Sequence, residues 1–134
     1  AFYALRDLSR AEALPFLTAA MQRSPVVLKA VEGLSDQDVA QRLAGLPNES
    51  IYDGAERLAQ PDEVWTFQRG DGLERLTALA AILRERHRDP CYRIDLDRER
   101  ATLRHADGRI VCVLPTGKRP RDKQWCLDAI PLRT

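Results

Sequence analysis

The stretch GDGLERLTALAAILRERH, residues 70–87, decides the fold of this chain. Asp71 is a candidate N-cap of a helix, and Glu74 three residues later completes the signature of a capping box. Apolar residues then recur over more than one narrow stripe of the helix: Leu73, Leu76, Leu79, Ala80, Ile82 and Leu83. A helix that is apolar around so much of its circumference is buried against other elements on two sides. The stretch therefore predicts the central helix of the domain.

Downstream of this helix, the hydrophobic period changes from 3.6 to 2. Residues 92–97 and 100–105 alternate between apolar and polar side chains, and Asp107-Gly108 is a hairpin signal that leads into the apolar run 110–114. A longer turn over 116–123 precedes a last strand around 125–130. We therefore expect a four-stranded antiparallel meander with one face against the central helix.

Upstream, residues 1–45 are typical of short helices. Their candidate start signals are Ser9 with Glu12, Ser24 followed by Pro25, and Ser35. Pro15 lies inside the first pattern, so that helix could instead begin or kink there. A further short helix from Pro61 is expected to pack through Val64, Trp65 and Phe67.

Length and composition predict one α+β domain over residues 1–134, with short helices over 1–45 and a core over 46–131. Hydrophobic residues at 44% and charged residues at 31% are typical of a globular protein. No apolar run is long enough to span a bilayer, and no signal peptide is visible. The chain begins without Met, which is compatible with a piece of a larger protein.

Charge and cysteine content narrow the classes of partner and cofactor. The net charge of +1 argues against wholesale binding to nucleic acid. Three cysteines without CxxC spacing favour a reducing, cytoplasmic compartment over a disulfide framework, and they predict no metal site. The Gly70-Asp71-Gly72 turn lacks the spacing of a phosphate-binding loop, so no cofactor is predicted either.

Two segments carry a resemblance to a known family: LAQPDEVWTFQRGDGLERLTALAAILRER (58–86) and RIVCVLPTGKRPRDKQWCLDAIP (109–131). A helix entered through Gly-Asp and followed by antiparallel strands resembles the core of the transglutaminase-like superfamily. The resemblance implies a Cys–His–Asp triad that performs acyl transfer or amide hydrolysis.

In this sequence the implied triad is incomplete. Gly72 stands at the nucleophile position and Asp128 at the position of the Asp. No His stands near 107–109, and His105 lies across the hairpin turn instead. The resemblance therefore implies a domain that has kept the fold and lost catalysis, and that serves as a binding or structural module. Its expected partner is a protein or another domain of the same polypeptide.

An enzymatic alternative uses Cys112 as a relocated nucleophile, with His105 and Asp128 on the same sheet face. His105 shares the strand parity of buried residues, so the competing interpretation is an imidazole satisfied by one hydrogen bond. Cys112 and Cys126 are expected to be cross-strand neighbours in the last hairpin, either as two small buried side chains or as a disulfide.

Two further groups are candidate binding residues. Lys118, Arg119, Arg121 and Lys123 predict a basic hairpin tip, either solvated or in contact with an anionic partner. Tyr52 and Asp53 lie in the longest irregular stretch, and long loops in a small domain often bind ligands.

Overall fold

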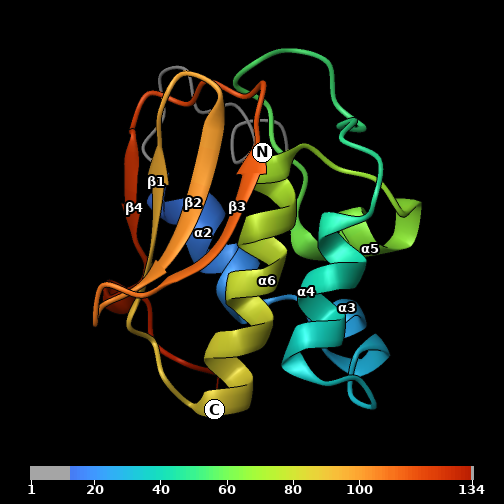
Figure 1. The fold of residues 1–134 in the computed structure, drawn as a ribbon, viewed down its shortest axis with the longest axis vertical. Helices are drawn as coiled ribbons and strands as arrows, with labels where there is room; N and C mark the ends of the chain where they lie inside the picture. The colour runs from blue at the N-terminus through green and yellow to red at the C-terminus, as the bar shows by residue number, and fades with distance from the viewer. Residues whose placement is uncertain (1–12, 134) are drawn as a thin grey trace.

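The computed structural model describes residues 13–133. These residues form five helices followed by four strands and a short 3-10 turn, which confirms the predicted α+β class (Figure 1). The elements are α2 (Leu14–Gln22), α3 (Pro25–Ala30), α4 (Asp36–Ala44), α5 (Pro61–Phe67), α6 (Gly72–His87), β1 (Tyr92–Leu96), β2 (Arg100–His105), β3 (Ile110–Pro115), β4 (Gln124–Cys126) and η1 (Leu127–Ala129).

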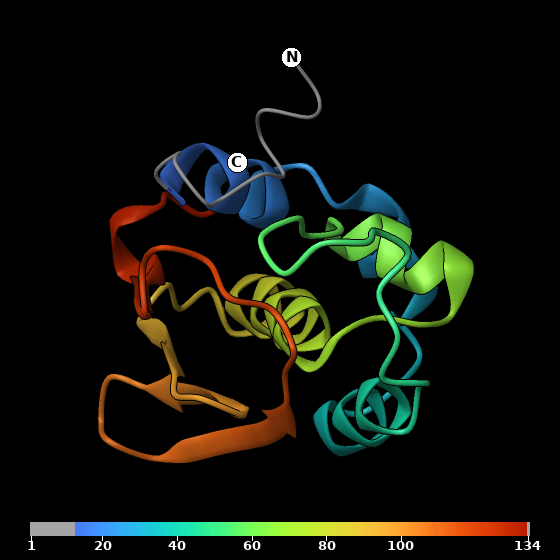
Figure 2. The same cartoon turned by 90° about the horizontal axis from the view of Figure 1, so that it is seen from above.

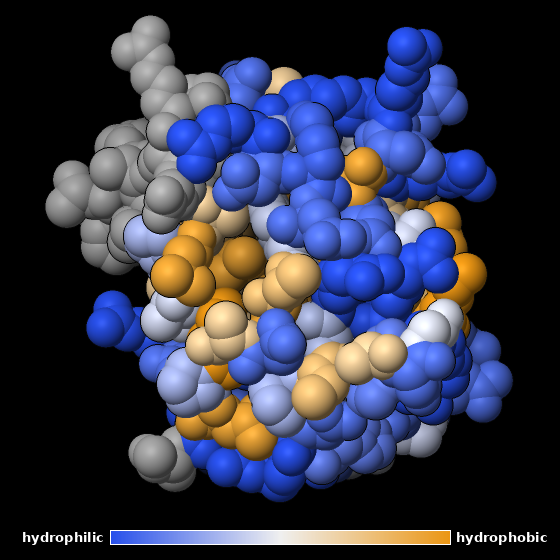
Figure 3. Space-filling view, turned by 90° about the vertical axis from the view of Figure 1, so that its left-hand side faces the viewer, coloured by the Kyte–Doolittle hydropathy of each residue, from blue (hydrophilic) through white to orange (hydrophobic). Residues whose placement is uncertain are grey.

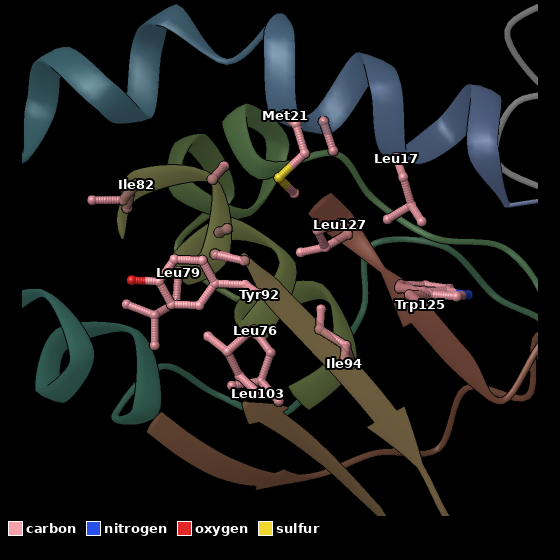
Figure 4. Close-up of a cluster of buried hydrophobic side chains, with 14 of the residues drawn as sticks. Leu17, Met21, Leu76, Leu79, Ile82, Tyr92, Ile94, Leu103, Trp125 and Leu127 are labelled. Atoms are coloured by element: carbon pink, nitrogen blue, oxygen red, sulfur yellow. The ribbon is translucent and has the colours of Figure 1, made fainter. Parts of the chain in front are cut away.

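Helix α6 is the centre of the molecule, as its sequence predicts. Seen from above, the sheet lies on one side of α6 and the other helices surround the rest (Figure 2). Every residue from Gly72 to Arg84 is buried. The hydrophobic core combines residues of α6 and α2 with the inner face of the strands (Figure 4). This arrangement explains why α6 is apolar over most of its girth.

The start of α6 is held by the predicted capping box. The carboxylate of Asp71 accepts a hydrogen bond from the Leu73 N–H at 2.8 Å, and Glu74 accepts one from the Asp71 N–H at 2.8 Å. Glu74 also accepts hydrogen bonds from the Ser50 hydroxyl and the Ala59 N–H. One buried carboxylate thus joins the long loop before α5 to the first turn of α6.

The strands form one antiparallel sheet in the order β3-β2-β1-β4. The first three strands make the expected meander, but β4 pairs with β1 and not with β3. The reason lies in residues 116–123, which do not fold back as a hairpin. Thr116 and Gly117 are instead hydrogen-bonded to the carboxylate of Asp71, so the chain leaves β3 over the start of α6.

The predicted helix caps are confirmed in part. The Ser35 hydroxyl accepts a hydrogen bond from the Asp38 N–H and caps α4. Ser24 does not cap α3, because its hydroxyl donates to the Ala20 carbonyl at 2.7 Å. Helix α2 begins at Leu14, with Pro15 in its first turn. The capping box of Ser9 and Glu12 lies outside the described residues.

Helix α5 buries less than its sequence predicts. Val64 is buried, but Phe67 is 57% exposed, and Trp65 is half-buried with the Arg42 guanidinium 5.3 Å from its ring centroid. A helix of seven residues presents only a narrow face to α6, which leaves room for few large side chains. Between residues 13 and 133, no helix combines the length and the apolar character that a membrane span requires.

Candidate functional site

The position that the resemblance assigns to a nucleophile is closed by packing. A Cβ atom on Gly72 would lie 2.8 Å from the carbonyl carbon of Pro115 and 2.9 Å from Cβ of Leu114. It would be closer still to the Pro115 carbonyl oxygen. Only glycine fits there, because the backbones of α6 and β3 are in direct contact. Gly72 is therefore a packing residue, and no opening exists at this point for a substrate.

The implied triad positions are not brought together. Gly72 begins α6 beside Pro115, which pairs with Arg100 at the start of β2. His105 ends β2 near the other end of α6, whose 16 residues correspond to a length of about 24 Å. Gly72 and His105 consequently lie at opposite ends of the central helix.

The alternative set of Cys112, His105 and Asp128 is not assembled either. Cys112 lies on β3 at one edge of the sheet, whereas Asp128 follows β4 at the other edge. Three strand spacings of about 4.8 Å separate these two edges by roughly 14 Å. Burial also raises the pKa of the Cys112 thiol above its usual value, so the thiol is a poor nucleophile at neutral pH.

The predicted pairing of Cys112 with Cys126 is wrong for the same reason. Cys112 is opposite Leu103 on β2, and Cys126 is opposite Arg93 on β1. Both cysteines are free thiols, as is Cys91. The prediction assumed that β3 and β4 are neighbours, and the strand order separates them.

His105 is engaged at both ring nitrogens. Its Nε2 lies 2.6 Å from a carboxylate oxygen of Asp89, and its Nδ1 lies 3.2 Å from Asp107. Hydrogen bonds from the Cys91 N–H and from His105 lower the pKa of Asp89 to about 2. His105 therefore joins the turn before β1 to the β2–β3 hairpin. A general base needs a free nitrogen, so this geometry favours the structural interpretation of His105.

The basic segment 116–123 is a structural connection and not a solvated hairpin tip. Lys118 is only 5% exposed, and its ammonium donates hydrogen bonds to the carbonyls of Tyr52 at 3.0 Å and Gly54 at 2.7 Å. Burial lowers the pKa of Lys118 below its usual value. This side chain is consequently not available to an anionic partner.

The other three cations of the segment are exposed, but each contacts a neighbouring group. Arg119 donates to the Lys118 carbonyl at 2.9 Å, and Lys123 donates to the Pro120 carbonyl at 2.7 Å. Arg121 lies 3.5 Å from the carboxylate of Asp122. These contacts stabilise the course of the segment, while the three side chains stay exposed at the surface.

The loop residues Tyr52 and Asp53 belong to the same structural unit. The Tyr52 hydroxyl donates to Glu63 at 2.5 Å, and the Tyr52 carbonyl accepts from Lys118. Asp53 is exposed beside them. The long loop is therefore attached to α5 and to the segment after β3, and Tyr52 is used in that attachment.

A hollow of about 660 Å³ lies between α4, the end of α6 and the β2–β3 hairpin. We call it the α4–β3 groove. Its walls and floor include Asp36, Ala40, Leu83, Tyr92, Arg109 and Val111. Its size is in the range of known ligand sites. The sequence offered no signal for this site, because the lining residues come from separate elements and share no motif.

The floor of the groove is formed in part by the buried ring of Tyr92. Tyr92 is 4% exposed, and its hydroxyl has no hydrogen-bond partner among residues 13–133. Burial raises the pKa of this hydroxyl. The hydroxyl points out of the hydrophobic cluster that surrounds the ring (Figure 4). The hydroxyl oxygen itself is open to the groove, where it can donate a hydrogen bond to a ligand.

The carboxylates of Asp36 and Asp89 that face the groove already have hydrogen-bond partners. Asp36 pairs with Arg86 at 3.0 Å and with His87 at 2.5 Å, and Asp89 pairs with His105. The Arg109 guanidinium, in contrast, pairs with no carboxylate of the described residues. The polar groups left available to a ligand are therefore mainly hydrogen-bond donors.

One wall of the groove is the outer edge of the sheet. The Thr116 N–H donates to the Glu99 carbonyl, and the β2–β3 register then directs the backbone groups of Leu114 and Cys112 toward β2. By the same alternation the backbone groups of Val113 point outward. The register shift between Leu103 and Arg104 interrupts this alternation, and the backbone groups of Ile110 point outward because the carbonyl of its neighbour Arg109 bonds to β2. Within the described part of the chain, no strand pairs with this edge.

A second, smaller hollow of about 170 Å³ brings two predicted residues together. His105 and Asp128 line it with Cys91 and Cys126. A hydrogen bond to Asp89 raises the pKa of the Cys91 thiol.

Nowhere in residues 13–133 do three His, Cys, Asp or Glu side chains converge as metal ligands. On the β4 side of the molecule, hydrophobic patches are broken up by hydrophilic residues (Figure 3).

Comparisons with models of known families, with curated proteins and with solved structures found no match for this chain.

Proposed function

We propose that this chain is a non-catalytic binding module whose α4–β3 groove takes an extended segment of a partner. That partner is a protein or another domain of the same polypeptide. The observation that carries the proposal is the edge of β3 in the wall of the groove, with which no strand of residues 13–133 pairs. An extended segment can add to such an edge through main-chain hydrogen bonds, while neighbouring pockets select its side chains.

Three observations support the absence of catalysis. Gly72 has no room for a side chain, His105 has no free nitrogen, and the Cys112 thiol has a raised pKa. A cysteine hydrolase needs a thiolate beside an imidazole, and no described pair meets that condition. The proposed kinship with the transglutaminase-like superfamily rests on the resemblance of the sequence alone, and it would concern the fold and not an active site. The three free thiols support a reducing, cytoplasmic compartment.

A peptide selection tests the binding half of the proposal. The chain is immobilised and offered random octapeptides that are displayed with free carboxy-termini. We expect Ala40→Trp, which fills the groove, to lose the peptides that the unchanged chain retains. Gln41→Trp is the matched control, because Gln41 is exposed on α4 and does not line the groove. Retention of no peptide, or equal retention by Ala40→Trp, would overturn the proposal.

Thiol reactivity tests the non-catalytic half. Iodoacetamide is added at pH 7, and alkylation of each cysteine is followed by mass spectrometry of peptide digests. We expect Cys112 to react more slowly in the folded chain than in the urea-unfolded chain. Cys126 is exposed and serves as the internal control. Faster reaction of folded Cys112, slowed by His105→Gln, would revive the enzymatic alternative.

A further inference from the structure

We infer that the end of the α4–β3 groove beside Arg109 is a carboxylate site, which binds a carboxylate of the segment in the groove. This inference rests on the proposed function and names the chemistry of the ligand. The carboxylate is either the carboxy-terminus of the segment or one of its acidic side chains. Tyr92 and Arg109 are the residues that would contact it.

The hairpin turn places Arg109 beside the floor of the groove. Gly108 takes a positive φ of 95°, and the Arg109 N–H donates to the Asp107 carboxylate at 2.8 Å. The Arg109 carbonyl accepts from the His105 N–H at 2.9 Å. The His105 ring in turn packs edge-on against Tyr92, with 5.0 Å between the ring centroids. Tyr92 and Arg109 therefore border the same end of the groove.

The surrounding side chains favour a ligand that is rich in hydrogen-bond acceptors. The titratable groups that face this end are Asp36, His87, Asp89, His105 and Asp107. Asp36 is already paired with Arg86 and Asp89 is hydrogen-bonded to His105, so a cationic ligand would have to displace Arg86 or a histidine. The guanidinium of Arg109 and the hydroxyl of Tyr92 are available as donors. A guanidinium binds a carboxylate through two parallel hydrogen bonds, which makes this ligand the best match.

The edge of β3 limits where the segment can pair. Ile110 directs its backbone groups outward next to Arg109, and Val113 does so further along the strand. Pro115 has no N–H, so it offers no donor at the far end of β3. Main-chain pairing is therefore available over the first part of β3, which is the part that borders the carboxylate site.

Synthetic peptides from the selection test the inference. The dissociation constant is measured by fluorescence anisotropy for each peptide as the free acid, as the carboxy-terminal amide, and with each Asp or Glu changed to Asn or Gln. We expect removal of the bound carboxylate to weaken binding about tenfold or more, since charge-assisted hydrogen bonds are the strong ones. Loss on amidation assigns the terminus, and loss on a side-chain change assigns that side chain.

Variants of the chain complete the test. We expect Arg109→Gln and Tyr92→Phe each to weaken binding, with the larger effect for Arg109→Gln, while thermal unfolding stays close to that of the unchanged chain. Arg98→Gln is the matched control, because Arg98 is exposed and does not line the groove. Binding that Ala40→Trp abolishes but that neither Arg109→Gln nor any carboxylate change affects would overturn the carboxylate site alone. If Ala40→Trp has no effect, the groove and the carboxylate site are both overturned.

Discussion

At the scale of single residues, Gly72 shows that a missing side chain can have a structural cause even where it looks like the loss of a catalytic residue. The missing side chain allows α6 and β3 to touch through their backbones. An active enzyme with a side chain at this position would need a wider gap between the two elements. The glycine is therefore matched to the present packing, and changing it to cysteine would not restore a site.

Gly72→Ala is expected to destabilise the fold by about 2 kcal/mol or more, because the added methyl group overlaps Pro115 and overpacks the α6–β3 contact. Gly33→Ala is the control. Nothing lies within 4 Å of a Cβ at Gly33, so its effect should stay within about 1 kcal/mol. Urea unfolding followed by circular dichroism measures both values. Equal effects would show that α6 and β3 do not touch at Gly72.

Asp89 predicts a pH dependence of stability. Its pKa falls from 3.8 to about 2 on folding, so the folded state favours the ionised carboxylate. The stabilising contribution is complete above pH 3.8 and is lost as the pH falls through 2. We therefore expect the difference in unfolding free energy between the unchanged chain and Asp89→Asn to shrink as the pH falls from about 5 to about 2. Urea titrations across this range measure it, and a constant difference would contradict the lowered pKa.

At the scale of elements, short helices depend on side chains from distant parts of the chain. Helix α3 has six residues, and its first N–H groups are capped by Asp62 at the start of α5. The distances to the Val26 and Val27 N–H groups are 3.2 and 2.8 Å. A helix this short is not stable alone, so packing and a cap from α5 decide its position.

We expect Asp62→Ala to lower the free energy of unfolding by about 1 kcal/mol, the usual cost of a lost N-cap. Asp53→Ala is the control, because Asp53 is an exposed aspartate with no cap interaction. Hydrogen exchange of the Val26 and Val27 amides gives a local measure beside urea unfolding. Unchanged protection of these two amides in Asp62→Ala would contradict the assignment of the cap.

At the scale of the whole molecule, two long connections close over the start of α6. Residues 116–123 cross from β3 toward β4, and Lys118 joins them to the loop that carries Tyr52 and Gly54. The Glu74 carboxylate accepts hydrogen bonds from Ser50 and Ala59 of the same loop. Together these contacts cover one end of the central helix, and the available hollow of about 660 Å³ lies beside the other end.

Lys118→Met tests this closure. The substitution keeps most of the buried stem but removes the ammonium, leaving the carbonyls of Tyr52 and Gly54 without their donor. We expect a loss of about 1–3 kcal/mol in unfolding free energy. Lys123→Met removes an exposed cation and should change stability by less than about 0.5 kcal/mol. Similar values for the two variants would mean that Lys118 is not a structural bridge.

The sequence by itself determined the features that depend on local pattern. Four features follow from neighbouring residues: the capping box at Asp71, the apolar surface around most of α6, the alternation of β1 and β2, and the cap at Ser35. Backbone hydrogen bonding and hydrophobic periodicity act over a few residues, so these features can be predicted without a tertiary structure.

Only the tertiary structure decided the strand order, the burial of Lys118 and the position of the groove. The course of 116–123 depends on Asp71, which is 45 residues away from Thr116 in the sequence. The groove combines α4, α6 and the β2–β3 hairpin, and the unpartnered hydroxyl of Tyr92 becomes visible only when the acceptors around it are known. Such contacts arise from packing between distant segments, and no local pattern in a single sequence encodes which segments meet.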